Sequence, residues 1–245
     1  MSLFAAPSPM QNLNRRQTLQ RLGKLAMVGG SAGLATGAVW ANAFDDYSRA
    51  LVSDNASLMV DLIFKGFDPN TKDSRGRPGL VSALHQDSLK VFDVLLKAPK
   101  IDLNAASAQN ETALMMTCIK GHLDLTKDLI KRGADVNREG WTPLHYAVSA
   151  DTPKSLDIVK LLLEEHAYID AASPNGSTPL MLAAQYSSED TVNLLLQEGA
   201  DVTLRNQRGL TAVDFAKLVD RQYMVKILNK ALQTERRTQP SRGSW

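Results

Sequence analysis

Two neighbouring stretches of the chain carry almost the same sequence, GWTPLHYAVSADTPKSLDIVKLLLEEHAYID at residues 140–170 and GSTPLMLAAQYSSEDTVNLLLQEGADV at residues 176–202. In both, a glycine precedes a Thr-Pro-Leu triplet, small residues follow, and an apolar stripe leads to an acidic end. Similarity at a fixed period is the sequence signature of repeat architectures. The period of this motif therefore decides which fold the chain can adopt.

The threonine of this motif returns along most of the chain. Its positions are Thr112, Thr142, Thr178 and Thr211, with spacings of 30, 36 and 33 residues, and Pro78 fills the same place 34 residues before Thr112. These spacings predict about six units of about 33 residues each. Their approximate limits are 44–70, 71–104, 105–137, 138–171, 172–204 and 205–232.

Each unit carries the signals of two short helices. Thr142 and Thr178 are typical N-cap residues, and each precedes a proline at the first helical position, where a missing N–H costs nothing. A second helix with an apolar stripe follows, and Gly133 or Gly199 ends it in the left-handed conformation. His166 takes the same place in the fourth unit. One such pair cannot bury its apolar face alone, so neighbouring pairs must stack.

These motifs resemble the ankyrin repeat in TPLHYA at 142–147, GHLDL at 121–125, GADVN at 133–137 and GADVT at 199–203, and the resemblance covers roughly residues 44–232. It implies an all-α solenoid of helix pairs with short β-hairpin fingers between the units. It also implies a non-enzymatic module without a cofactor that binds other proteins through its concave face. That face consists of the fingers and the first, inner helix of each unit. We expect a monomer.

Two segments depart from the family pattern. Three residues are missing between Asn137 and Thr142, which predicts a shortened finger. Three residues are added between Thr142 and Asp157, which predicts an enlarged turn between the two helices of the fourth unit. The sixth unit places polar Arg221 at its turn, as a capping repeat should. Residues 233–245 are basic and lack apolar periodicity, so we expect a disordered tail there.

The first 43 residues are predicted to be a signal peptide. Arg15 and Arg16 resemble the twin-arginine export motif, a weakly apolar run follows, and Ala41 and Ala43 form a small-x-small cleavage site. The residues after the arginine pair match that motif only in part. We therefore expect a periplasmic protein that begins at Phe44.

Three alternatives to this interpretation stay open. The N-terminal segment can remain uncleaved and tether a structural or adaptor protein to a membrane. It can be a mitochondrial presequence, since it bears arginines and no acidic residue, or translation can start at Met10. Gly29, Gly33 and Gly37 dilute the apolar run, which disfavours a permanent membrane span. None of these alternatives changes the repeat domain.

Charge and cysteine content exclude several classes of function. Residues 1–43 contain four basic and no acidic side chains, so the 24 basic and 26 acidic side chains that remain leave the rest of the chain mildly acidic. This balance does not predict a nucleic-acid surface. The single cysteine, Cys118, excludes an internal disulfide and a zinc site with several thiolates, and we expect it to be buried and inert. His145 and His122 fall in family motifs and are expected to be structural.

The resemblance also indicates where a partner would bind. The family's variable positions lie on the fingers and at the ends of the inner helices, and here they hold Arg75, Arg77, Gln109, Glu111, Trp141, Asn175, Gln185 and Tyr186. We expect these residues to contact a periplasmic or envelope protein. Trp141 has two interpretations, as an aromatic anchor for the partner or as a side chain folded back over the shortened finger. An exposed Ile119 would form an apolar stripe with Tyr186. The sequence predicts no metal site and no catalytic site.

Overall fold

The structure is a computed structural model that describes residues 35–238. Within this range it contains twelve helices and no β-strand, which confirms the predicted all-α repeat fold. The fingers are tight turns rather than β-hairpins: Lys72 and Pro78 form the one isolated antiparallel bridge in the described residues. Their tips close over too few residues for a β-ladder to form. Arg15 and Arg16, the predicted export residues, lie outside the described range.

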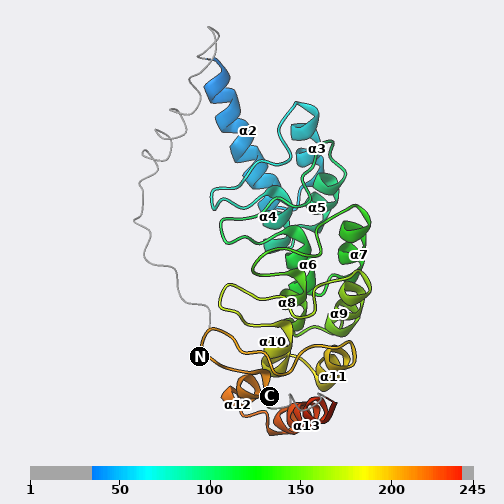
Figure 1. The fold of residues 1–245 in the computed structure, drawn as a ribbon. Helices are drawn as coiled ribbons and strands as arrows, with labels where there is room; N and C mark the ends of the chain where they lie inside the picture. The colour runs from blue at the N-terminus through cyan, green and yellow to red at the C-terminus, as the bar shows by residue number, and fades with distance from the viewer. Residues whose placement is uncertain (1–34, 239–245) are drawn as a thin grey trace, which may run out of the picture. The chain divides into compact units, whose positions relative to one another are not determined.

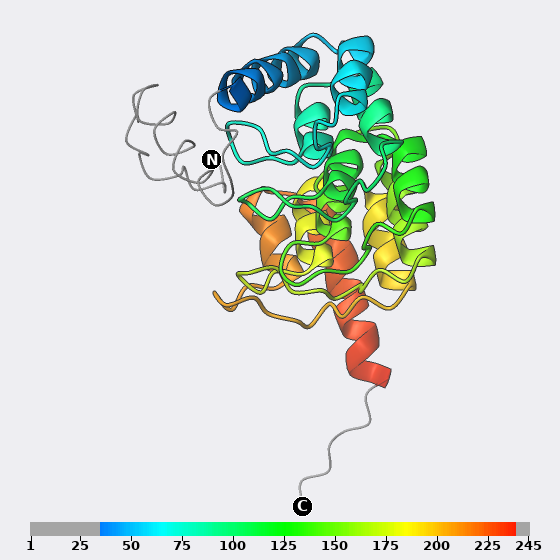
Figure 2. The same cartoon turned by 90° about the horizontal axis from the view of Figure 1, so that it is seen from above.

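The helices follow one another in pairs, each an inner helix and then an outer helix (Figure 1). The pairs are α2 (Ala35–Val52) with α3 (Ala56–Phe64), α4 (Gly79–His85) with α5 (Leu89–Leu96), α6 (Ala113–Lys120) with α7 (Leu123–Lys131), α8 (Pro143–Val148) with α9 (Ser155–Glu164), α10 (Pro179–Tyr186) with α11 (Glu189–Gln197), and α12 (Ala212–Leu218) with α13 (Gln222–Thr238). From α4 to α12 the inner helices pack on one another in order. Figure 2 shows the fingers on one side of this row and the outer helices on the other.

The predicted helix ends are confirmed. The Oγ1 atom of each repeat threonine from Thr112 to Thr211 accepts a hydrogen bond from the backbone N–H three residues later, at 3.3–3.4 Å. Pro143 and Pro179 occupy the first helical position. Beyond the outer helices, the backbone takes φ +95° at Gly133 and +93° at Gly199, and His166 adopts the same left-handed region at +62°.

Stacking of the inner and outer helices forms the core. Leu144, Ile158 and Leu162 of the fourth unit are fully buried, and so are Leu114, Leu129, Leu180 and Leu195 of its neighbours. Cys118 is also fully buried, and burial raises the pKa of its thiol to about 12. The thiolate, which is the reactive form, is therefore not populated at neutral pH. The prediction of a buried packing residue is confirmed.

His145 links the fourth unit to the fifth. Its Nδ1 accepts a hydrogen bond from the backbone N–H of Thr142 at 3.2 Å, and its Nε2 lies 3.0 Å from the carbonyl oxygen of Ser177. A carbonyl can only accept, so Nε2 carries the proton and the ring is neutral. The structural role predicted for this histidine is confirmed.

We expect acid to destabilise the protein through His145. Burial lowers the pKa of this side chain from 6.5 to about 4. Between these two values the unfolded chain binds a proton that the folded protein does not, so the stabilisation is complete above pH 6.5 and is lost as the pH falls toward 4. Between pH 7.5 and pH 4.5 the loss should be about 2.5 kcal/mol, measured by chemical denaturation at these two pH values.

A variant of His145 isolates this effect from other titrating groups. In the fifth unit, Met181 takes the same place, and its Sδ accepts from the backbone N–H of Thr178 at 3.4 Å. His145→Met should therefore fold and show a smaller loss of stability at pH 4.5 than the wild type. An equal loss in both proteins would contradict the assignment.

A ladder of amide side chains joins the bases of the fingers. The Oδ1 atoms of Asn70, Asn104 and Asn137 each accept the backbone N–H of a residue in the next finger, at 2.8–2.9 Å. The Nδ2 atoms of Asn70 and Asn137 also donate to a backbone carbonyl there, both at 2.9 Å. At the fourth place the ladder has Asp170, which accepts from the N–H of Asp201 at 3.1 Å and has no amide N–H to give.

Asp170→Asn should stabilise the protein by about 1 kcal/mol, the usual worth of one hydrogen bond. Burial, together with the charge of Asp201, raises the pKa of the Asp170 carboxyl, although the N–H of Asp201 opposes this. An amide removes that charge and offers an N–H toward the carbonyl of Gly199. Urea denaturation at pH 7 checks the result, and the reverse change Asn137→Asp should lower stability by a similar amount. A gain in stability from both variants would contradict the ladder.

The two predicted length changes are present. Between helix caps, the third finger runs from Arg132 to Thr142, whereas the fourth runs from Glu165 to Thr178. The turn between α8 and α9 is enlarged, and Thr152 from this turn lies against the third unit. A Cβ atom placed on Gly121 would clash with Thr152 Oγ1, so the turn closes directly over a glycine.

Both ends of the repeat domain differ from expectation. Helix α2 begins at Ala35, before the predicted first unit, and contains Ala41 and Ala43. Helix α13 continues to Thr238, into the tail that was expected to be disordered. There, the backbone N–H of Val202 hydrogen-bonds Glu235 and Thr234 Oγ1 donates to a helix carbonyl. Residues 239–245 lie outside the described range. Among the helices described, none is both long and apolar enough to cross a membrane.

Candidate functional site

The finger tips share one construction. In the first, second, fourth and fifth fingers, the backbone N–H of Asp73, Ser107, Ser173 or Asn206 donates to the carbonyl four residues later, at 2.8–3.0 Å. The side chain of the same residue also accepts backbone N–H groups within the turn. In the part of the chain that the structure describes, the shortened third finger has no such turn. The four complete tips are therefore rigid without help from a ligand.

The candidate residues at the tips differ in how free they are. Arg75 and Gln109 are exposed, and their backbones rather than their side chains hold the turns. Asn175 is exposed as well, but its Oδ1 accepts from Ser173 Oγ at 2.7 Å and from the N–H of Ser177 at 3.1 Å. The side chain of Asn175 therefore closes its own turn, which leaves Arg75 and Gln109 as the free tip residues.

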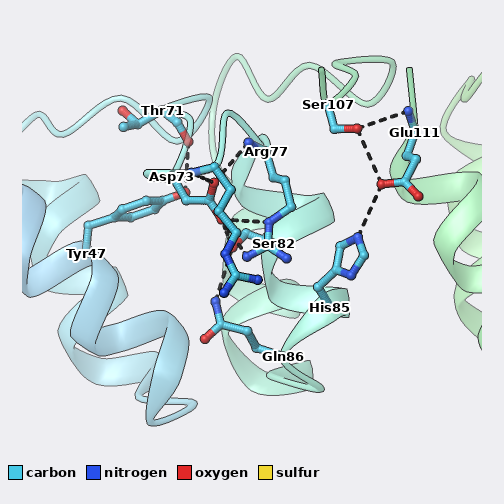
Figure 3. Close-up of polar contacts among 10 residues, drawn as sticks. Tyr47, Thr71, Asp73, Arg77, Ser82, His85, Gln86, Ser107 and Glu111 are labelled. Atoms are coloured by element: carbon cyan, nitrogen blue, oxygen red, sulfur yellow. Dashed lines mark hydrogen bonds and ion pairs between the residues drawn. The ribbon is translucent and has the colours of Figure 1, made fainter. Parts of the chain in front are cut away.

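Arg77 is engaged inside its own finger (Figure 3). Its Nε and Nη2 atoms both lie 2.8 Å from Asp73 Oδ2, and its side chain is 13% exposed. Ser82 Oγ donates to the same oxygen from α4 at 2.8 Å. Burial alone would raise the pKa of Asp73, but the hydrogen bonds from Arg77, Ser82 and the finger backbone together lower it. Arg77 thus fixes the first finger to the inner helix.

Glu111 ties three units together. Its Oε2 lies 3.4 Å from His85 Nε2 in α4 and 3.4 Å from Ser107 Oγ in its own finger. Tyr146 of α8 hydrogen-bonds the same carboxylate. The contact with His85 lowers the pKa of Glu111 more than burial raises it. Like Arg77, Glu111 serves the scaffold, although it was expected to be free for recognition.

Trp141 packs partly on its own unit and partly faces an open cleft. Its ring lies edge-to-face with His145, with centroids 5.4 Å apart and an interplanar angle of 83°, so it packs back on the fourth unit. The rest of the half-buried ring faces a cleft of about 540 Å³ between the second, third and fourth fingers. The cleft, called the notch below, lies where the shortened third finger leaves space. Gln109 also lines it.

The end of α10 carries the other two candidates. Tyr186 is 44% exposed, whereas Gln185 is half-buried and its Oε1 is a buried acceptor without a hydrogen-bond partner in the described residues. Arg221 from the sixth unit donates to the carbonyl of Ala184 at 3.1 Å and also to Ser187. These bonds close the C-terminal end of α10, so Tyr186 is held in a fixed position.

Sequence reasoning missed an apolar surface in the sixth unit. Leu218 is 61% exposed, and Val219 and Tyr223 are also exposed. A signal for the first two exists, because they follow Thr211 at the same distances as Gln185 and Tyr186 follow Thr178. The expected stripe with Ile119 does not form, since Ile119 is only half-exposed and the fourth unit lies between. The apolar surface therefore extends from Tyr186 toward the C-terminal end of the stack.

The described residues contain no group of three or more His, Cys, Asp or Glu side chains placed to hold a metal ion. Both ring nitrogens of His145 are occupied by hydrogen bonds within the scaffold. The fingers and inner helices thus form a surface whose turns are closed by hydrogen bonds of the chain itself.

Comparison with known proteins identifies the repeats. The family described as "Ankyrin repeats (3 copies)" matches residues 49–139, 80–173 and 150–235. The putative ankyrin repeat protein YahD of Escherichia coli K12 is 36% identical over 146 residues, which are 57% of this chain and 72% of that protein. The NF-kappa-B p105 subunit of Gallus gallus is 29% identical over 171 residues, 67% of this chain but 17% of that protein.

A solved structure is also similar. One chain of the complex between the predatory endopeptidase Bd0816 of Bdellovibrio bacteriovorus and the immunity protein Bd3460 aligns with a TM-score of 0.63 at 28% identity. The alignment covers 76% of this chain and 96% of that chain.

Proposed function

This chain belongs to the ankyrin-repeat family, and from that membership we propose that it is an exported, non-enzymatic scaffold whose concave face binds a periplasmic or envelope protein. The observation that carries the proposal is that this face is already ordered in the chain alone. Four finger tips are closed by their own hydrogen bonds, while the side chains of Arg75, Gln109 and Tyr186 are exposed. A surface that is already ordered loses little conformational entropy on binding.

The similarity to a chain of the Bd0816–Bd3460 complex supports a protein partner, and an enzyme is one class that such a partner can belong to. In that complex an endopeptidase and an immunity protein are bound to each other. The alternative is a membrane-tethered structural or adaptor protein with an uncleaved N-terminal segment. That alternative keeps the same concave face and differs only in that the chain stays attached to a membrane.

Site-specific cross-linking tests the scaffold. A photoreactive amino acid at Tyr186, on the concave face, should yield one dominant cross-linked protein in envelope preparations from the native organism. The same amino acid at Lys160, which is exposed on the outer helix α9, is the matched control and should not yield it. Cross-linking of the same protein from Lys160 but not from Tyr186 would show that the outer helices carry the interface.

Export is tested at the N-terminus. We expect the envelope-located protein to begin at Phe44, because Ala41 and Ala43 form the predicted cleavage site. Mass spectrometry of the extracted protein measures this, and an intact N-terminal segment would favour the tethered alternative. Arg15→Lys combined with Arg16→Lys should block export without unfolding the repeats, whereas unimpaired export would exclude the twin-arginine route.

A further inference from the structure

In the notch, three fingers meet around an open space of about 540 Å³. Its walls are Gln109 and Asn110 of the second finger, Glu139 and Trp141 of the third, and Ser173 and Pro174 of the fourth. It exists because the third finger is too short to fill the gap between its neighbours. A protruding side chain of another protein can therefore enter between the second and fourth fingers.

Glu139 is the only charged side chain that lines the notch. It is exposed, and no salt bridge or hydrogen bond joins its carboxylate to another described residue. The neighbouring Arg138 does not neutralise it, because the Arg138 guanidinium donates to the carbonyl of Asn104 at 3.3 Å and to Asn110 Oδ1 at 3.0 Å. The notch thus presents one free negative charge.

Trp141 supplies the second group in the notch that can bind a cation. Its indole lines the notch beside Pro174, and its contact with the neutral, buried His145 leaves no cation on the ring. A flat cation binds well to a tryptophan face, and a guanidinium can also donate in parallel to a carboxylate. An ammonium is a compact, strongly hydrated charge and matches this pair of groups less well.

We propose that the notch receives an arginine side chain from a protruding loop of the protein partner, with the guanidinium between the Trp141 indole and the Glu139 carboxylate. The proposal rests on the proposed function, because it names the chemistry of the partner at that same face. An acidic side chain would meet the Glu139 charge, and an apolar one would cover that carboxylate without pairing it. An arginine side chain can pair with the Glu139 carboxylate and also stack on the Trp141 indole.

The test uses the full chain, labelled with ¹⁵N, and the peptide acetyl-Gly-Arg-Gly-amide as the probe. We expect the indole N–H resonance of Trp141 to shift and saturate with a Kd of about 1 mM, the range for a single-residue contact. The peptide with citrulline in place of arginine has the same shape without the charge and should bind at least about fivefold more weakly. No saturable shift, or equal binding of the citrulline peptide, would overturn the proposal. Equal binding of a lysine peptide would overturn the choice of arginine.

Variants assign the site. Glu139→Gln should weaken binding of the arginine peptide about fivefold, the upper range for an exposed ion pair. Glu165→Gln, at an exposed position outside the notch, is the matched control and should bind the peptide as the wild type does. Unchanged binding in Glu139→Gln would overturn the proposal. The peptide test and the cross-link at Tyr186 can fail independently. A cross-link without peptide binding would overturn only the proposal for the notch. Peptide binding without a cross-link would overturn the proposed scaffold function.

Discussion

Ala184→Glu should lower the free energy of unfolding by about 4 kcal/mol. Ala184 is fully buried in α10, which packs between α8 and α12. A glutamate at this position has to bury an unpaired carboxylate or push the two neighbouring inner helices apart. Its carbonyl also accepts from Arg221, so any shift of α10 disturbs the closure of that helix by the sixth unit. Urea denaturation followed by circular dichroism measures the loss.

Tyr186→Glu is the matched control for this prediction. It places the same charge two residues later in α10, where the side chain is 44% exposed, and should change stability by about 0.5 kcal/mol or less. A denaturation curve of Ala184→Glu that coincides with that of the wild type would show that the stacking of the inner helices is not as described. A large loss in Tyr186→Glu would show the same.

Trp141→Ala and Tyr186→Ala should each weaken binding of the cross-linked partner about 30-fold, since aromatic anchors typically contribute about 2 kcal/mol or more. Tyr186 makes its contribution from an exposed position, so its removal should leave stability unchanged. Trp141 packs on His145, so its removal should also lower the free energy of unfolding by about 1 kcal/mol. Titration calorimetry with the purified partner and denaturation of the same variants measure both quantities.

The two variants also decide between the interpretations of Trp141. If Trp141→Ala loses stability and keeps its affinity, the ring serves only to cover the shortened finger. If affinity survives the double variant Trp141→Ala with Tyr186→Ala, the partner does not bind the concave face. Leu218→Ala then tests the adjacent apolar surface of the sixth unit.

The fold was predictable because each unit repeats the same local signals. The threonine caps, the prolines of α8 and α10, and the left-handed residues after the outer helices all lie where the sequence places them. A solenoid needs only contacts between neighbouring units, so no long-range pairing had to be guessed. The helical continuation of α13 to Thr238 was missed, because its contact with the fifth finger joins distant residues.

The site was less predictable because a position in a repeat does not reveal its partners. Arg77 and Glu111 occupy variable positions of the repeat. Only the folded chain shows that Asp73 pairs with Arg77 and that His85 contacts Glu111. The notch also needed the structure. Its cause, the shortened finger, was visible in the sequence, but the space between three separate fingers was not.

The amide ladder has a mechanical consequence. Each rung joins one finger only to the next, as the stacked helices do, so the links of the stack lie in series along its axis. A pulling force on the two ends acts on every link equally, and the weakest link extends first. The hydrogen bond of the Asp170 rung is 3.1 Å long, against 2.8–2.9 Å at the asparagine rungs, and the charge of Asp201 opposes the Asp170 carboxylate. The stack should therefore open first between the fourth and fifth units. Stretching the chain would thus widen the notch before any helix unwinds, because Ser173 and Pro174 belong to the fifth unit and Trp141 to the fourth.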